Sequence, residues 1–382
     1  MPRRPLVALL VETSNTYSRE LLHGIRAYLR EHGPWSIQLT EQGRGGEPPN
    51  WLKNWHGHGI IARIETGEIA RAVRATGLPV VNVSASRLAP EFPCVINDSR
   101  AIANLAFVHL RERGFRHVGY FGDARFEWAR SHETNFEQLA REAGAECSIY
   151  PAHRDDAIDV EAEQRKIQQW LAGLSKPVGI MACYDVRGRQ LLESCRMSNI
   201  PVPDEIAVIG VHNDDLLCDL CDPPLSSVIP NARKSGYEAA SLLDRMMRGE
   251  APGAVTVRTP PIGVATRQST DVIALDDRSV AQAVRFIREH SAEGITVVEV
   301  LRHVPMSRTL LEKKFKKLLG RTPHEHILLT RINRVKEQLI TTDLPVARIA
   351  EQNGFEHTEY LSVAFKRVTG MSPAQFRRQQ QR

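Results

Sequence analysis

The stretch VVEVLRHVPMSRTLLEKKFKK, residues 297–317, has the same layout as VARIAEQNGFEHTEYLSVAFKR, residues 346–367. In each copy, an apolar-periodic helix is followed by a short turn and then by a second helix that ends in Phe and basic residues. Each copy therefore predicts a helix-turn-helix unit. A pair of such units is an arrangement that reads DNA, because each second helix can enter a major groove.

The first copy carries local signals for both of its helices. Thr296 and Glu299 have the spacing of a capping box that opens the first helix, Pro305 ends it, and Ser307 can cap the second. Apolar side chains that recur at helical spacing predict the buried face of the second helix: Leu311, Phe315 and Leu318.

The outer faces of the two second helices are polar and basic. The predicted DNA-contacting residues are Arg308, Thr309, Glu312, Lys313 and Lys316 in the first copy, and Thr358, Glu359, Ser362, Lys366 and Arg367 in the second. We expect Arg308, Lys316, Lys366 and Arg367 to hold phosphates and the other six to contact bases. A spacer helix, residues 324–341, predicts that the two units occupy successive major-groove segments, about 34 Å apart. An ordinary amphipathic hairpin is an equal alternative for either copy alone, but the repetition disfavours it.

Charge is distributed unevenly along the 382 residues, whose net charge is +5. Residues 277–382 contain 19 Lys and Arg against 11 Asp and Glu, whereas residues 1–276 contain 31 against 34. A basic excess confined to one end is expected when one domain must neutralise phosphates, although a solvated basic surface is an alternative.

Composition indicates a cytoplasmic globular protein. Hydrophobic residues make up 42%, and no apolar run approaches the roughly 18 residues of a membrane span, so we expect no membrane partner. Six scattered cysteines do not form a disulfide framework. Cys218 and Cys221 lie near His212, but a structural zinc site needs four ligands, and we expect neither a metal nor a cofactor.

The first 270 residues alternate short apolar runs with amphipathic segments. Predicted strands cover residues 6–11, 59–62, 79–83, 117–121, 178–182 and 206–211, and predicted helices cover residues 17–30, 101–113 and 233–248. This alternation predicts an α/β fold of parallel sheets with helices on both faces, divided near residue 105 into two lobes. Ligands of such folds bind at the carboxyl ends of the strands.

A polar stretch, residues 265–278, lacks a helical period and is predicted to contain the linker. We therefore expect a two-lobed α/β sensing domain over residues 1–270, a linker over residues 271–278, and an all-α domain with two helix-turn-helix units over residues 279–382.

The last hundred residues resemble the DNA-binding domain of the AraC/XylS family. The pattern A-x-x-x-G-F, then F-K-[KR], then G-x-[ST]-P-x-x-[FY]-R is present at residues 350–355, 365–367 and 370–377. In the first copy, Leu301 stands at the usual small residue and Pro305 at the usual turn glycine. Because proline cannot adopt a positive φ, that turn must differ locally.

The preceding residues resemble the sugar-sensing domain of the LacI/GalR family, which is similar to periplasmic sugar-binding proteins. The phrases are RERGFRHVGYFG (111–122), IPVPDEIAVIGVHND (200–214) and DPPLSSV (222–228). This sensor joined to an AraC-type reader resembles the XylR family of xylose-operon activators, with similar phrases along essentially the whole chain. The resemblance implies a dimeric activator that binds double-stranded DNA and a small sugar such as D-xylose, and that contacts RNA polymerase.

A pyranose site needs side chains that pair with hydroxyls and an aromatic ring that stacks on the sugar. By resemblance the ligand-binding candidates are Asn15, Tyr17, Asp98, Trp128, His132, Asp185, Arg187, His212 and Asn213, with Trp128 as the stacking ring. Asp98 precedes a helix and is equally well explained as an N-cap. His132 stands where the family usually has a sugar-contacting Arg, and His212 where it usually has Asp.

Two alternatives stay open at this point: a DNA-tethered enzyme acting in the cleft, and a repressor that responds to another small polar ligand. A sugar-transport binding protein is a further rival, but the predicted reader domain and the missing signal peptide contradict it. No nucleophile elbow, phosphate loop or dinucleotide fingerprint is present in the sequence, so we expect no catalytic residues.

Overall fold

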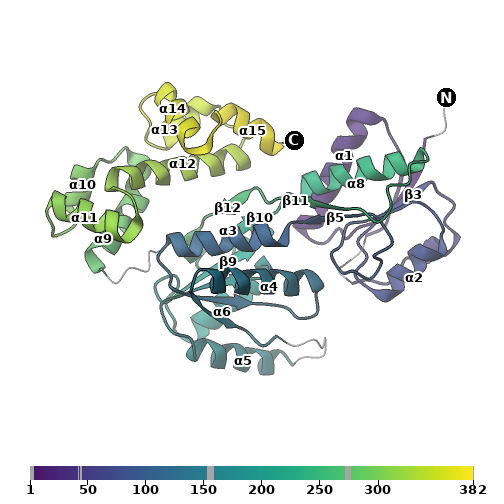
Figure 1. Cartoon of the computed structure of the whole chain (residues 1–382), viewed down its shortest axis with the longest axis horizontal. Coiled ribbons are helices and arrows are strands. Elements are labelled where there is room, and N and C mark those ends of the chain that lie inside the picture. The colour runs from purple at the N-terminus through teal and green to yellow at the C-terminus, as the bar shows by residue number, and fades with distance from the viewer. Residues whose placement is uncertain (1–3, 42, 44, 153–158, 272–276, 382) are drawn as a thin grey trace.

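The computed structural model describes residues 4–41, 43, 45–152, 159–271 and 277–381. Two α/β lobes lie side by side, and an all-α domain, the reader, lies next to the second lobe (Figure 1). Each lobe contains one six-stranded sheet.

The first lobe has the strand order β11-β5-β4-β3-β1-β2, and neighbouring strands of this sheet pair in the parallel direction. Its strands are β1 (Leu6–Leu10), β2 (Ser36–Leu39), β3 (Gly59–Ala62), β4 (Val80–Asn82), β5 (Cys94–Asn97) and β11 (Thr256–Thr259). Its helical elements are α1 (Thr16–His32), the 3₁₀ helix η1 (Asn50–Asn54), α2 (Gly67–Ala75) and α8 (Ala232–Met247).

The second lobe has the strand order β12-β10-β9-β8-β6-β7, in which β12 alone pairs in the antiparallel direction among the described strands. Its strands are β6 (His117–Phe121), β7 (Glu146–Ile149), β8 (Val178–Ala182), β9 (Ile206–Val211), β10 (Ser226–Ile229) and β12 (Gly263–Ala265). Its helical elements are α3 (Ser99–Glu112), α4 (Glu127–Glu142), α5 (Val160–Ala172), α6 (Asp185–Met197), α7 (Asp215–Asp219) and the 3₁₀ helix η2 (Gln268–Thr270).

The two-lobed parallel α/β architecture expected from the sequence is confirmed. All six predicted strands are present as β1, β3, β4, β6, β8 and β9. The chain crosses between the sheets after β5, β10 and β11, so β11 returns to the first lobe although it lies late in the sequence. The predicted division near residue 105 falls inside α3, which packs on α4 in the second lobe.

Helix α1 crosses α8 at unusually close range. A Cβ atom on Gly24 of α1 would lie 1.9 Å from the Arg233 carbonyl oxygen, and one on Gly236 of α8 would lie 2.0 Å from the Leu21 carbonyl oxygen. Glycine is therefore required at both positions. This crossing fixes the start of α1, which enters the interlobe cleft.

The reader consists of two helix-turn-helix units joined by one long helix. Its elements are α9 (Arg278–His290), the 3₁₀ helix η3 (Ser291–Glu293), α10 (Val297–Arg302), α11 (Arg308–Leu319), α12 (Pro323–Thr341), α13 (Val346–Gln352), α14 (Thr358–Thr369) and α15 (Pro373–Gln381). The predicted capping box at Thr296 and Glu299 is present, and the Ser307 side chain accepts a hydrogen bond from the Leu310 backbone N–H.

Each unit has its own hydrophobic core, and α12 contributes to both. Ile327 packs into the core of the first unit, whereas Leu328 and Ile332 pack into that of the second. The prediction that Leu318 is buried is wrong, because its side chain is 36% exposed. At 3.6 residues per turn, positions 318 and 319 lie on either side of the buried stripe, and Leu319 packs against the core instead.

The two helix-turn-helix units meet at a pair of glycines. Gly294 and Gly354 have φ of +77° and +70°, and a Cβ atom on Gly354 would lie 2.6 Å from the Gly294 nitrogen. Arg331 of α12 donates hydrogen bonds to the backbone carbonyls of Ser291 (2.9 Å) and Ile295 (2.7 Å), and its guanidinium lies 6.0 Å from the ring centroid of Phe355. These contacts join the first unit to the second and hold their relative orientation.

The start of the stretch predicted to contain the linker belongs to the second lobe. Ala265 belongs to β12, and Ser269 and Thr270 are buried in the second lobe. Most of the predicted linker, residues 272–276, lies outside the described residues. No described helix is long and apolar enough to cross a membrane.

We expect Gly354→Ala to destabilise the chain more than Gly370→Ala. Both residues have positive φ, which costs a non-glycine residue about 1–2 kcal/mol, but only the Gly354 variant adds a clash, because nothing lies within 4 Å of a Cβ at Gly370. Urea unfolding followed by far-ultraviolet circular dichroism would measure the difference. Equal losses from the two variants would contradict the close approach of the two units.

Candidate functional site

A cleft between the two lobes contains two adjoining cavities that share Tyr17 and His212. The first cavity, about 40 Å³, is lined from the first lobe by residues that include Tyr17, Arg63, Glu65, Ser84 and Asn97, and from the second lobe by Trp128, His132 and His212. The second cavity, about 270 Å³, is lined by Ser14, Asn15, Thr16, Tyr17, Tyr184, Asp185, Val186, His212, Asp214 and Leu217. Both cavities lie at the carboxyl ends of strands, where an α/β fold binds ligands.

Aromatic rings line the place where the lobes meet. The ring centroids of Tyr17 and His212 lie 5.1 Å apart across the cleft. Trp128 lies 5.8 Å from His212 and 5.6 Å from Tyr184, measured between ring centroids. Such a wall offers the apolar surface on which the ring of a small polar molecule can stack.

A buried ion-pair cluster lies under Tyr17 on the first lobe. Arg63 binds Glu65 at 2.8 Å and Glu12 at 3.4 Å, and its guanidinium lies 5.4 Å from the Tyr17 ring centroid. Sequence reasoning missed Arg63 and Glu65, although they directly follow the strand β3. That position at a strand end was the signal that could have found them.

His132 lies on α4 and is 4% exposed. Burial lowers the pKa of its imidazole to about 4, so the ring is neutral near pH 7. A neutral imidazole has one N–H donor and one nitrogen lone pair, so it can both donate and accept a hydrogen bond.

Asp185 and Asp214 form the polar side of the second cavity. Asp185 accepts hydrogen bonds from the Ser227 hydroxyl (2.6 Å) and the Asp214 backbone N–H (2.8 Å). Burial raises the pKa of Asp185 to about 7 in spite of these bonds. Asp214 in turn accepts a hydrogen bond of 2.8 Å from the Thr16 hydroxyl on the other lobe. Asp214 therefore links the two lobes directly.

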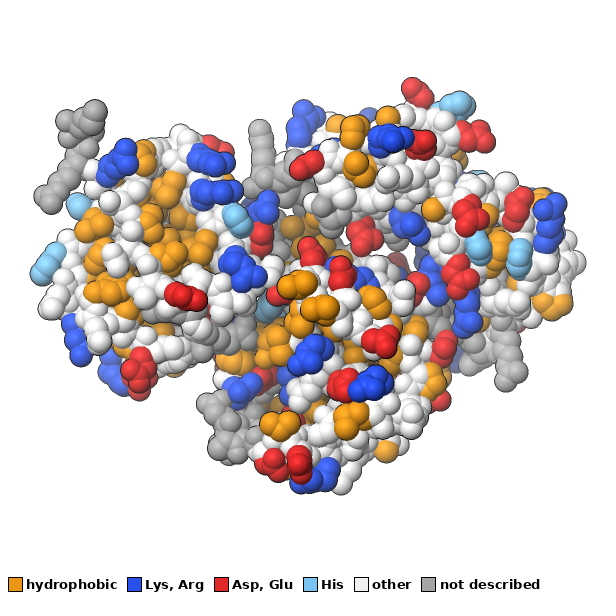
Figure 2. Space-filling view, turned by 180° about the vertical axis from the view of Figure 1, so that it is seen from behind, with side chains coloured by type: hydrophobic (Ala, Val, Ile, Leu, Met, Phe, Trp, Pro, Cys, Tyr) orange, Lys and Arg blue, Asp and Glu red, His pale blue; other side chains and the backbone are white. Residues whose placement is uncertain are grey.

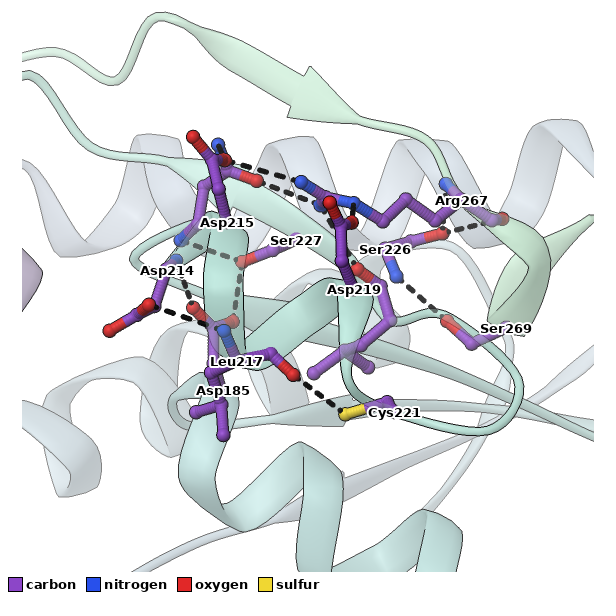
Figure 3. A network of polar contacts seen from close by, with 12 residues as sticks. Asp185, Asp214, Asp215, Leu217, Asp219, Cys221, Ser226, Ser227, Arg267 and Ser269 are labelled. Atoms are coloured by element: carbon purple, nitrogen blue, oxygen red, sulfur yellow. Dashed lines mark hydrogen bonds and ion pairs between the residues drawn. The ribbon is translucent and has the colours of Figure 1, made fainter.

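The same network continues from the cleft to the end of the sensing domain (Figure 3). Arg267, which follows β12, binds Asp219 at 2.8 Å and Asp215 at 3.2 Å, and donates to the Asn213 side-chain oxygen at 2.8 Å. His212 and Asn213 have φ of 103° and 50°, in the left-handed region, so the loop after β9 is tightly bent.

The structure brings most of the predicted ligand residues together. Six of them line one or both cavities: Asn15, Tyr17, Trp128, His132, Asp185 and His212. Asn213 lies behind the cleft in the Arg267 network.

Like Asn213, two further predicted ligand residues line neither cavity. Asp98 caps α3 through its bond to the Ala101 N–H at 3.0 Å, which is the alternative that the sequence allowed. Arg187 binds Glu163 at 3.1 Å and stacks on Phe121 in the interior of the second lobe.

Ion pairs join the sensing domain and its linker to the reader. Arg285 of α9 binds Asp204 of the second lobe at 3.4 Å, and Arg288 binds Asp271. Helix α9 therefore contacts both the second lobe, through Asp204, and Asp271.

The recognition helices α11 and α14 present the predicted polar stripes. Arg308, Thr309, Lys313, Lys316, Glu359, Lys366 and Arg367 are exposed, and Glu312, Thr358 and Ser362 are partly exposed. Arg308 binds Glu312 at 3.0 Å. Sequence reasoning missed the exposed apolar side chains of the same helices, namely Leu310, Tyr360 and Val363. Acidic and basic side chains are interspersed over the face of the reader seen in Figure 2, so its basic excess does not form one continuous patch there.

A two-lobed cleft joined to paired helix-turn-helix units defines a ligand-responsive, DNA-binding transcription regulator. Family models match in three places: the XylR N-terminal domain at residues 6–98, a periplasmic binding protein-like domain at residues 107–270, and a helix-turn-helix domain at residues 300–379.

Relatives that match along nearly the whole chain indicate the same class of protein. The chain is 32% identical to the xylose operon regulatory protein of Escherichia coli K12, over 98% of this chain and 97% of that protein, and 31% identical to that of Haemophilus influenzae, over 97% of each. The solved structure described as xylose-binding transcription activator xylR has 31% sequence identity and a TM-score of 0.65, with 98% of each chain covered. The chain belongs to the family of xylose operon regulatory proteins, which are sugar-responsive, DNA-binding transcription regulators.

We expect Lys316→Ala and Glu312→Ala to affect DNA binding differently. Loss of one phosphate contact should weaken binding to every sequence and reduce the slope of log affinity against log salt by about 0.9, whereas loss of Glu312 should change the preference at one or two base pairs. Fluorescence anisotropy with sites selected from random DNA and with a random duplex would measure both effects, with Arg141→Ala on the sensor as the control. Equal effects of the two variants on both duplexes would contradict these roles.

We expect His132→Gln to flatten the acid side of the stability profile. Below its ordinary pKa of 6.5 the unfolded chain protonates this ring, whereas the folded chain resists protonation down to about pH 4, so the free energy of unfolding falls as the pH falls through this window. Between pH 7.5 and 5 the variant should lose about 2 kcal/mol less than the parent chain. Urea unfolding at the two pH values measures this, and parallel profiles would show that the ring titrates normally.

Proposed function

We propose that this chain is a cytoplasmic, homodimeric activator of a pentose catabolic operon, with D-xylose or a closely related pentose as its effector. The observation that supports this most is the identity of 32% to a xylose operon regulatory protein over 98% of the chain. The cleft adds support, because it combines aromatic rings with hydrogen-bonding side chains from both lobes.

In this proposal the effector binds in the interlobe cleft. The residues that contact it are Asn15, Tyr17, Trp128, His132, Asp185 and His212, together with Arg63 and Glu65, which line the first cavity. A ligand that contacts both lobes favours the closed arrangement, since the contacts from both sides exist together there. The change in lobe arrangement alters how the paired subunits present their readers to DNA and to RNA polymerase. The protein acts by binding, and turns over neither the sugar nor the DNA.

A second candidate is a regulator, including a repressor, that responds to a different small polar ligand. It is favoured by His132 and His212, which line the cleft where the family usually has Arg and Asp. Replacing a guanidinium and a carboxylate by two imidazoles changes which hydroxyl pattern is satisfied.

Isothermal titration of the full chain with D-xylose, L-arabinose, D-ribose, D-glucose and D-galactose tests the effector. We expect binding heat with D-xylose, and loss of that heat in Trp128→Ala but not in Trp170→Ala, whose ring lies outside both cavities. Heat with another sugar and none with D-xylose would replace the proposed effector by that sugar.

A further inference from the structure

Two buried hydrogen-bond acceptors line the first cavity, and neither has a hydrogen-bond partner among the described residues. They are Oε2 of Glu65, whose side chain is 8% exposed, and Nδ1 of His132, which is 4% exposed. Glu65 belongs to the first lobe and His132 to the second. Buried polar atoms in folded proteins are almost always paired, so two unpaired acceptors in one cavity indicate a ligand that supplies two donors.

Nδ1 of His132 is an acceptor because the single ring proton is carried by the other ring nitrogen, Nε2. The His132 ring is neutral at pH 7 and donates its hydrogen bond to the backbone of Cys183. Since Nδ1 has no partner, that bond is made by Nε2, which must carry the single ring proton. Nδ1 is then left with an unpaired acceptor lone pair on a residue that lines the first cavity.

The charge around Glu65 excludes a negatively charged ligand. Oε1 of Glu65 accepts a hydrogen bond of 2.8 Å from Arg63, and Glu12 shares the same guanidinium at 3.4 Å. Two carboxylates surround one guanidinium, so the cluster carries an excess negative charge. An anionic ligand would place like charges together in a poorly solvated site.

We propose that Glu65 Oε2 and His132 Nδ1 form a paired acceptor site, one acceptor from each lobe, for two hydroxyl groups of a neutral polyol. This inference rests on the proposed function, and it specifies the chemical class of the effector. Hydroxyl groups donate to both acceptors and bridge the lobes. Phosphorylated sugars and sugar acids are rejected by the carboxylates. The acceptor at position 132 thereby selects the orientation of the bound hydroxyl.

The test uses the full chain and whichever neutral sugar of the titration panel gives binding heat. We expect His132→Phe, which retains a ring without an acceptor, to weaken binding roughly tenfold or more, and His132→Gln, which restores an acceptor, to recover part of the loss. Glu65→Gln should weaken binding similarly. His117→Phe, a histidine at the opposite end of β6, is the matched control and should bind as the parent chain does.

Monodeoxy analogues of the same sugar assign the contacts. One analogue should bind the parent chain roughly tenfold more weakly than the full sugar, and this difference should disappear in His132→Phe but persist in Glu65→Gln. D-Xylonate and D-glucose 6-phosphate should give no binding heat with the parent chain. Circular dichroism and unchanged thermal midpoints exclude loss of folding as the cause of weak binding.

The outcomes separate this inference from the proposed function. If the parent chain binds a neutral sugar and both His132→Phe and Glu65→Gln bind it equally well, the acceptor pair is refuted and the proposed function stands. Tighter binding of an anionic probe than of every neutral sugar also refutes the acceptor pair. If no neutral sugar binds the parent chain, both are refuted together.

Discussion

The contact between the lobes across the cleft is the constraint on which the rest of the sensor depends. Tyr17 and His212 face each other at 5.1 Å between ring centroids, and the Thr16 hydroxyl donates to Asp214 of the opposite lobe. The close crossing of α1 and α8 fixes the start of α1, and the bent loop after β9 fixes His212. Within each lobe, the backbone therefore holds the cavity-lining side chains in place. The distance between the side chains of one lobe and those of the other depends on how the two lobes are arranged.

Arg267 lies where a change in the arrangement of the lobes can be transmitted from the sensor to the reader. It binds Asp215 and Asp219 of α7, and α7 begins at Asp214, the residue that contacts the other lobe. Four residues further on, Asp271 pairs with Arg288 of the reader. A short polar path thus runs from the cleft to the first helix of the reader. Asp215 and Asp219 are exposed, whereas Arg267, Asp271 and Arg288 are largely buried, so salt screens the pair of Asp271 and Arg288 less than it screens surface pairs.

Much of this fold was predictable because its signals are local. Buried parallel strands are continuous apolar runs, which is why β1, β3, β6, β8 and β9 were found, and the repeated helix-turn-helix layout predicted the reader. Short strands such as β2 and β11 carry no such run, and their place depends on pairing with distant segments. In the site, Trp128 and His212 could be predicted from sequence phrases that resemble the family. Glu65 could not, because its role depends on its ion pair with Arg63 and on the residues of the opposite lobe that line the same cavity. Arg187 was misplaced because a buried partner, Glu163, lies on another helix.

A ligand shifts an equilibrium between lobe arrangements only by its difference in affinity for them. Under the proposed acceptor pair, Glu65 and His132 would supply such a difference through their solvation. In an open cleft, water can hydrogen-bond both acceptors. Closing the cleft without an effector would bury both without partners, which disfavours closure. Under this proposal, an effector with two suitably spaced hydroxyl groups would remove this penalty and add its own contacts, so the same two atoms would oppose closure in its absence and favour closure in its presence.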